Sequence, residues 1–141
     1  MSNSRTMLVT LALGATLAFA GPAFAEKMKA TLDGKSEVPA NTSAGKGTAD
    51  IDYDAATKKL TWKLTYSGLS GPATAAHFHG PAEAGKNAGV AVAIPNAGTS
   101  PAEGSATLTD AQAADLAAGK YYVNVHTAAN PGGEIRGQVT K

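Results

Sequence analysis

Apolar and polar residues alternate most regularly along residues 58–68, KKLTWKLTYSG. One set of alternate positions is apolar or aromatic and the other is charged or hydroxylated: Leu60, Trp62, Leu64 and Tyr66 against Lys59, Thr61, Lys63 and Thr65. Because successive side chains of a strand point to opposite faces, this pattern predicts a strand with one face in a core and the other in water. One-sided burial of this kind is common in antiparallel sheets.

Seven further segments carry shorter strand patterns: 27–34, 47–53, 75–79, 89–94, 103–108, 120–127 and 134–140. Turn-forming residues separate them, such as Gly80-Pro81 and the run Asn130-Pro131-Gly132-Gly133. Short strands with this spacing predict an all-β fold, an antiparallel Greek-key β-sandwich or flattened barrel of about seven or eight strands. The two glycines of the last turn are expected to supply positive φ angles between 120–127 and 134–140.

One short helix is predicted at residues 109–119, TDAQAADLAAG. Thr109 can cap the first turn, and Gln112 stands three residues later, as in a capping box. Gly119 can adopt the left-handed conformation that ends many helices. The segment is therefore expected to connect two strands as a single helical crossover.

The first residues predict an export signal rather than part of the fold. Arg5 precedes the apolar run 7–20, and Ala23-Phe24-Ala25 matches an A-x-A cleavage site. We expect residues 1–25 to be a cleaved signal peptide and 26–141 to be a single domain, periplasmic or secreted. The apolar run is shorter than the roughly 20 residues that a membrane-spanning helix needs.

Composition narrows the classes of partner. Removal of Arg5 leaves 11 basic and 11 acidic residues, so the mature chain is formally neutral. A neutral balance does not favour binding to nucleic acid or to an anionic membrane. The sequence contains no cysteine, which excludes disulfides, thiolate metal sites and thiol catalysis.

All three histidines lie in predicted strands. His77 and His79 lie in AAHFHGPA (75–82), on the face opposite Phe78, and His126 in YYVNVHT (121–127) is expected to point to the outer face of its own strand. If the two strands are neighbours, three imidazoles can meet at one ion, and loops 80–89 and 128–134 can cover it. The alternative is a solvated histidine cluster without a ligand.

Copper is preferred over zinc for such a site. Imidazole binds both metals, but copper(II) binds a given nitrogen site more tightly. Glu134 follows the Gly132-Gly133 turn and can act as a fourth ligand or accept a hydrogen bond from an imidazole N–H. Its alternative interpretation is a carboxylate beside a turn, paired with a lysine or with Arg136.

Several of these segments together resemble the CHRD domain, named after chordin and common in secreted bacterial proteins. The matching motifs are HFHGPA (77–82), VNVHT (123–127), NPGGEIRG (130–137) and the early L-D-G-x-x-E-V-P (32–39). The resemblance spans essentially the whole mature chain. It implies a secreted β-sandwich, but no generally agreed reaction.

A fainter likeness is to copper/zinc superoxide dismutase, which also has a β-sandwich with an H-x-H pair. That enzyme uses about six histidines, an aspartate and a disulfide, whereas this chain has three histidines and no cysteine. Two interpretations therefore remain ahead of a dismutase-type oxidoreductase. One is a non-enzymatic protein that binds a copper or zinc ion through His77, His79 and His126, and the other is an extracellular protein-interaction module using loops 80–89 and 95–104.

Overall fold

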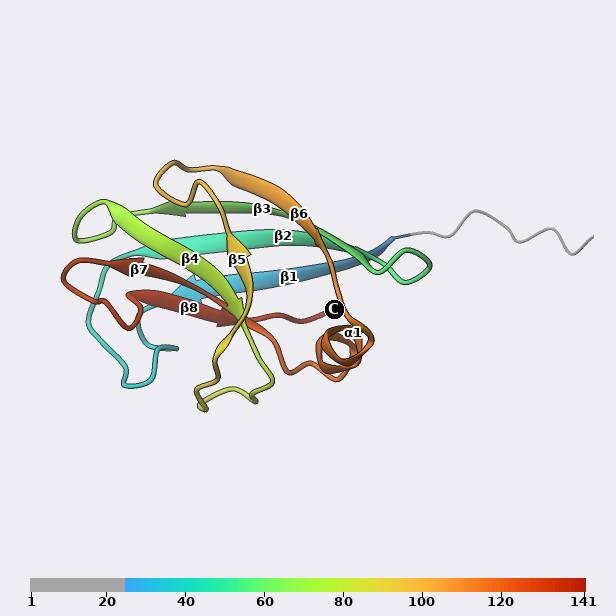
Figure 1. Cartoon of the computed structure of the whole chain (residues 1–141). Coiled ribbons are helices and arrows are strands. Elements are labelled where there is room, and N and C mark those ends of the chain that lie inside the picture. Colours follow the sequence, from blue (N-terminus) through green and yellow to red (C-terminus); the bar gives the residue numbers. More distant parts are fainter. Residues whose placement is uncertain (1–24) are drawn as a thin grey trace, which may run out of the picture.

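The computed structural model describes residues 25–141 (Figure 1). Within that range it has eight strands and one helix: β1 (Glu26–Asp33), β2 (Lys46–Asp54), β3 (Lys59–Ser67), β4 (Ala73–His79), β5 (Val90–Ile94), β6 (Ala102–Thr107), α1 (Asp110–Ala117), β7 (Tyr122–Thr127) and β8 (Ile135–Gln138). Every predicted strand and the predicted helix are present, and the all-β fold class is confirmed. Apart from Ala25, the predicted signal peptide lies outside the described residues.

All eight strands belong to one sheet, in the order β5-β4-β7-β8-β1-β2-β3-β6, and every pairing is antiparallel. The pairs β4-β7, β8-β1 and β3-β6 join strands that are not consecutive in the chain. The two edge strands, β5 and β6, contact each other, so the sheet nearly closes into a flattened barrel (Figure 1).

The core lies between the two walls of this barrel. β3 buries every second residue from Leu60 to Leu64, as its alternation predicts. Trp62 packs edge-on against Phe78 of β4, with ring centroids 5.3 Å apart, and so joins the two walls. Each fully buried aliphatic or aromatic side chain of this kind stabilises the fold by about 1.5–3 kcal/mol.

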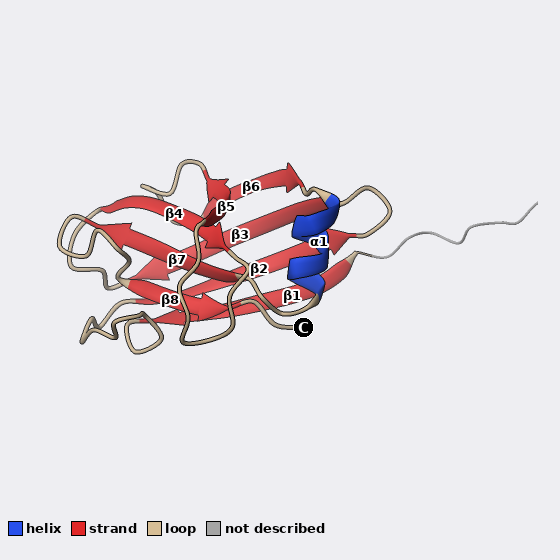
Figure 2. Cartoon of the chain, turned by 60° about the horizontal axis from the view of Figure 1, so that its bottom comes forward, coloured by secondary structure: helices blue, strands red, loops and turns tan. Residues whose placement is uncertain are grey.

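The helix closes one end of the barrel, close to the C-terminus, as Figure 2 shows. Its start has the predicted capping box: the Thr109 hydroxyl accepts from the Gln112 amide, and the Thr109 amide donates to the Gln112 side chain. Gly119 follows the helix with φ +75°, as expected. Among the described residues, no helix is both long enough and apolar enough to span a bilayer.

One turn differs from its prediction. β7 and β8 are joined by a seven-residue loop, 128–134, in which Gly133 has a positive φ of 129° and Gly132 does not. Hydrogen bonds from Asn130 N to Thr127 O and from Gly133 N to Asn130 O build this loop from two successive turns. The chain between β7 and β8 is therefore long enough to fold over the outer face of the sheet.

Candidate metal centre

The three histidines lie on neighbouring strands and on the same, outer face of the barrel wall. β4 pairs with β7, and the register places Ala75 opposite His126 and His77 opposite Asn124. Phe78 and Val125, which alternate with the histidines, are fully buried in the core. The alternation therefore predicted the direction of His77, His79 and His126, and the pairing of β4 with β7 brings them together.

Their ring nitrogens form a compact cluster. One nitrogen from each ring can be chosen so that all three lie within 4.8 Å of one another. The closest pair is His77 Nδ1 and His126 Nε2, at 3.0 Å. The His77 and His79 ring centroids are 5.3 Å apart, and those of His79 and His126 are 6.0 Å apart. Side chains from two strands thus converge on one small volume.

Two loops cover this cluster, in the positions that the sequence suggested. His79 Nδ1 lies 3.0 Å from the Ala88 carbonyl oxygen in loop 80–89, and His126 Nδ1 lies 2.9 Å from the Pro131 carbonyl oxygen in loop 128–134. His79 and His126 are only 8% and 9% exposed, whereas His77 is partly exposed. A solvated cluster is therefore the wrong description of His79 and His126.

The same two contacts fix the tautomers. A carbonyl oxygen can only accept, so Nδ1 carries the proton in both His79 and His126, and Nε2 carries the lone pair. With these tautomers, His77 Nδ1–H donates to His126 Nε2. His79 Nε2 is buried and has no hydrogen-bond partner among the described residues. Metal-binding histidines characteristically donate their second ring N–H to a carbonyl or carboxylate in this way.

Burial also keeps two of the imidazoles neutral. Desolvation lowers the pKa of His77, and the neighbouring His126 and His79 lower it further. Desolvation likewise lowers the pKa of His79, outweighing the opposite effects of its hydrogen bond to Ala88 and of the Asn124 side chain. A neutral imidazole is the form that binds a metal ion, so these shifts favour binding near neutral pH.

Loop 80–89 is held in place by two residues that sequence reasoning did not identify. The Tyr122 hydroxyl accepts from the Ala88 amide and donates to the Ala88 carbonyl, each at 3.1 Å. The Arg136 guanidinium lies 3.5 Å from the Tyr122 ring centroid and donates to the Asn87 side chain and the Lys86 carbonyl. The Ala88 carbonyl that orients His79 is therefore itself held in position by Tyr122.

Glu134 occupies a separate, fully buried site. Its two oxygens accept hydrogen bonds from Ser43 Oγ, from Ser70 N and Oγ, from Thr127 Oγ1 and from Asn130 Nδ2. Burial alone would raise the pKa of this carboxyl, but the hydrogen bonds from Ser70, Thr127 and Ser43 lower it to about 2.

These contacts differ from both interpretations drawn from the sequence. Within the described residues Glu134 makes no hydrogen bond to a histidine and no ion pair with a lysine or with Arg136. We therefore leave Glu134 out of the ligand set. Its role in the structure is to connect the β1–β2, β3–β4 and β7–β8 loops at one end of the barrel.

A buried asparagine lies next to the histidines, and a buried glutamate lies near that asparagine. Asn124 is 2% exposed and Glu37 is 5% exposed, although alternation placed Asn124 on the outer face of its strand and Glu37 lies in a polar segment. Burial raises the pKa of Glu37 to about 7, while Arg136 and the Asn124 side chain act to lower it. In the sequence, Asn124 could be assigned to the outer face of its strand, and Glu37 could be noted as the acidic residue of L-D-G-x-x-E-V-P. Neither observation indicates that the side chain is buried under a loop.

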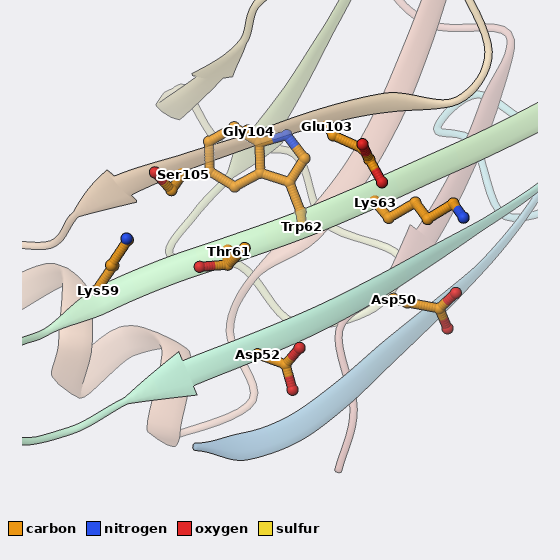
Figure 3. Close-up of a pocket in the computed structure, with 9 residues that line it drawn as sticks. All are labelled: Asp50, Asp52, Lys59, Thr61, Trp62, Lys63, Glu103, Gly104 and Ser105. Carbon is orange, nitrogen blue, oxygen red and sulfur yellow. The ribbon is translucent and has the colours of Figure 1, made fainter. Parts of the chain in front are cut away.

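A hollow on the opposite wall has a different character (Figure 3). It lies over β2, β3 and β6, where Asp50, Lys63 and Glu103 are cross-strand partners. Opposite charges in register stabilise a sheet surface in water, and this hollow contains none of the histidines. We interpret it as the solvent-facing surface of that wall.

Comparison with known proteins gives one match. The family model described as the CHRD domain matches residues 28–139, which include every strand residue that carries the histidine cluster. No curated protein and no solved structure matches the chain.

Proposed function

The chain belongs to the CHRD domain family, and we propose that it binds one metal ion through His77, His79 and His126, with copper preferred over zinc. Three imidazoles without a neighbouring thiolate or ligand carboxylate suit a divalent ion of borderline hardness. The three histidines are all that the sequence contains, so a second histidine centre of the dismutase kind has no ligands. The proposed role is binding or handling of the ion rather than catalysis.

One observation carries this proposal: the preset tautomers of His79 and His126. Each donates Nδ1–H to a loop carbonyl and keeps the Nε2 lone pair inside the cluster. A buried acceptor without a donor, such as His79 Nε2, costs about 1–3 kcal/mol. A bound cation would satisfy that lone pair and recover this cost.

The preference for copper rests on the type of ligand. Copper(II) binds a given set of nitrogen ligands more tightly than zinc does.

We further propose that the protein acts outside the cytoplasm, after cleavage behind Ala25. β1 begins at Glu26, and Glu26 pairs with Tyr53, so this cleavage leaves the whole sheet intact. The intact mass of the protein recovered from a native periplasmic or culture fraction tests the cleavage site. A mass that retains residues 1–25 would contradict it.

The metal proposal is tested by calorimetric titration of the untagged mature chain with Cu(II) and Zn(II). We expect one ion per chain and tighter binding of Cu(II). A free-ion concentration about 100 times Kd should stabilise the fold by about 2.7 kcal/mol. Each of His77→Ala, His79→Ala and His126→Ala should weaken binding, and Lys63→Ala on the open wall should not.

The same variants separate metal binding from the interaction-module alternative. Absence of binding by the wild type, or equal affinity in His126→Ala, would overturn the metal proposal. Partner capture through loops 80–89 and 95–104 that survives all three histidine substitutions would then favour the interaction module.

A further inference from the structure

Asn124 occupies the centre of the histidine cluster on the sheet surface. It lies directly opposite His77 across the β4–β7 pair and two residues before His126 on β7. His79 is two residues beyond His77 on the same face of β4. Opposite residues have Cβ atoms about 4.5–5.5 Å apart, and diagonal neighbours are within reach of longer side chains. Asn124 is therefore the sheet neighbour of all three histidines.

A contact with the loop above it indicates the orientation of the Asn124 amide. Asn124 Nδ2 lies 3.5 Å from the Gly132 carbonyl oxygen, to which it donates, so Oδ1 is on the other side of the amide. Oδ1 is buried and has no donor within residues 25–141. The amide thus presents a lone-pair oxygen away from the loop, at the level of the imidazoles.

Glu37 lies beside the nitrogen end of this amide. Gly133, with φ 129°, lies where an added Cβ would collide with both Glu37 Oε1 and Asn124 Nδ2, so these two atoms meet at the glycine. The Asn124 side chain acts to lower the pKa of Glu37, as an N–H donor to a carboxylate does.

Three buried acceptors in this region have no donor within residues 25–141: His79 Nε2, Asn124 Oδ1 and Glu37 Oε1. Each would normally be paired, because an unsatisfied buried acceptor is costly. A cation bound by the histidines would be attracted to the amide oxygen as well. Amide oxygens are established ligands for hard cations and are poor ligands for soft ones.

We propose that Asn124 is the fourth protein ligand of the metal centre, with its Oδ1 bound to the same ion as the three histidines and its Nδ2 directed to the Gly132 carbonyl. This inference rests on the proposed metal-binding function. It assigns a three-nitrogen, one-oxygen ligand set, which selects a divalent ion such as Cu(II) or Zn(II) and disfavours Cu(I). The oxygen is thus a determinant of which oxidation state is held.

The test uses the mature chain and three substitutions at one position. Asn124→Leu keeps similar volume but has no donor atom, and it should lower Cu(II) affinity by about 10- to 100-fold while changing Cu(I) affinity far less. Asn124→Asp keeps the oxygen and adds charge, so it should retain Cu(II) binding with altered g and copper hyperfine values in electron paramagnetic resonance. Asn96→Asp, the same change at an exposed residue between β5 and β6, is the control and should leave the spectrum unchanged.

The outcomes separate this inference from the proposed function. If the wild type binds Cu(II) and Asn124→Asp gives the wild-type spectrum, Asn124 is not a ligand, whereas the three-histidine site stands. If the wild type binds no ion, the proposed function itself fails. If Asn124→Leu does not fold, Asn124→Ser replaces it, and the spectrum of Asn124→Asp remains decisive.

Discussion

The outer faces of the two barrel walls differ in burial. Along β3 the outer residues are exposed lysines and threonines, whereas all six residues of β7 are buried. Both strands alternate in sequence, and both send their apolar residues to the core. The difference is that loops 80–89 and 128–134 cover the β4–β7 wall, while β2, β3 and β6 face water (Figure 3). Alternation fixes the direction of a side chain, and the loops decide whether it is buried.

The largest expected difference is in the loss of stability when a buried carboxylate and a carboxylate of the open wall are each replaced by an amide. In Glu134→Gln, an amide N–H₂ would face hydrogen-bond donors in a fully buried site, and charge-assisted bonds from Ser43, Ser70, Thr127 and Asn130 would be lost or weakened. We expect a loss of about 3 kcal/mol in the free energy of unfolding near pH 7, measured by urea denaturation. The matched change on the open wall, Glu103→Gln, should stay within about 0.5 kcal/mol.

Acid should remove the contribution of Glu134 in the wild type. The pKa of this carboxyl is about 2 in the folded chain, against an ordinary value of 4.5. Its stabilisation is therefore complete above pH 4.5 and is lost as the pH falls towards 2. The Glu134→Gln variant should lose less stability over that range, and parallel acid curves for the two proteins would contradict the assignment.

A smaller difference is expected in copper binding when each of two tyrosines that donate to backbone carbonyls is replaced by phenylalanine. Tyr122 bonds to Ala88 beside the histidines, and Tyr66 bonds to Ala97 in the loop between β5 and β6. Tyr122→Phe and Tyr66→Phe should each cost about 1 kcal/mol of stability. Only Tyr122→Phe releases the carbonyl that orients His79, so only this variant should weaken Cu(II) binding, by about 10-fold or more. Equal copper affinities in a calorimetric titration would show that the tie between Tyr122 and Ala88 does not support the site.

The sequence predicted the fold and the direction of the histidines because both depend on local alternation. Residues such as Leu60 and Phe78 mark the core face of their own strands without reference to the rest of the chain. The sequence did not predict that β4 and β7 pair with each other, because that pairing depends on the order of all the strands in the sheet.

The environment of the site could not be predicted in the same way. Glu134, Arg136 and Asn124 are polar residues in segments that alternate or turn, and their burial results from contacts with loops distant in sequence. Ser43 and Ser70, for example, reach Glu134 from 91 and 64 residues away. The loops next to the histidines were predicted to cover them, but no short-range pattern indicates that loops so distant in sequence enclose Glu134.

The smallest expected effect is a difference in the pH dependence of stability between about pH 5 and pH 7.5, where Glu134 stays ionised. The pKa of His79 is lowered by burial from its ordinary value of 6.5, so the unfolded chain binds more protons and stability falls as the pH drops below 6.5. Glu37 acts in the opposite direction. Burial raises its pKa from 4.5 to about 7, so its folded form takes up a proton and gains stability as the pH falls.

Two variants measure separately how Glu37 and the histidines of the covered wall change stability with pH. Glu37→Gln removes the acidic contribution, so stability of the metal-free chain should rise more steeply with pH than in the wild type. His77→Ala combined with His79→Ala removes the basic contribution, so the slope should become shallower or reverse sign. Glu103→Gln on the open wall should leave the wild-type slope, measured as melting temperature against pH. If the Glu37 and histidine variants change the slope in the same direction, the buried protonation states assigned to this wall are wrong, because acids and bases shifted by burial must oppose each other.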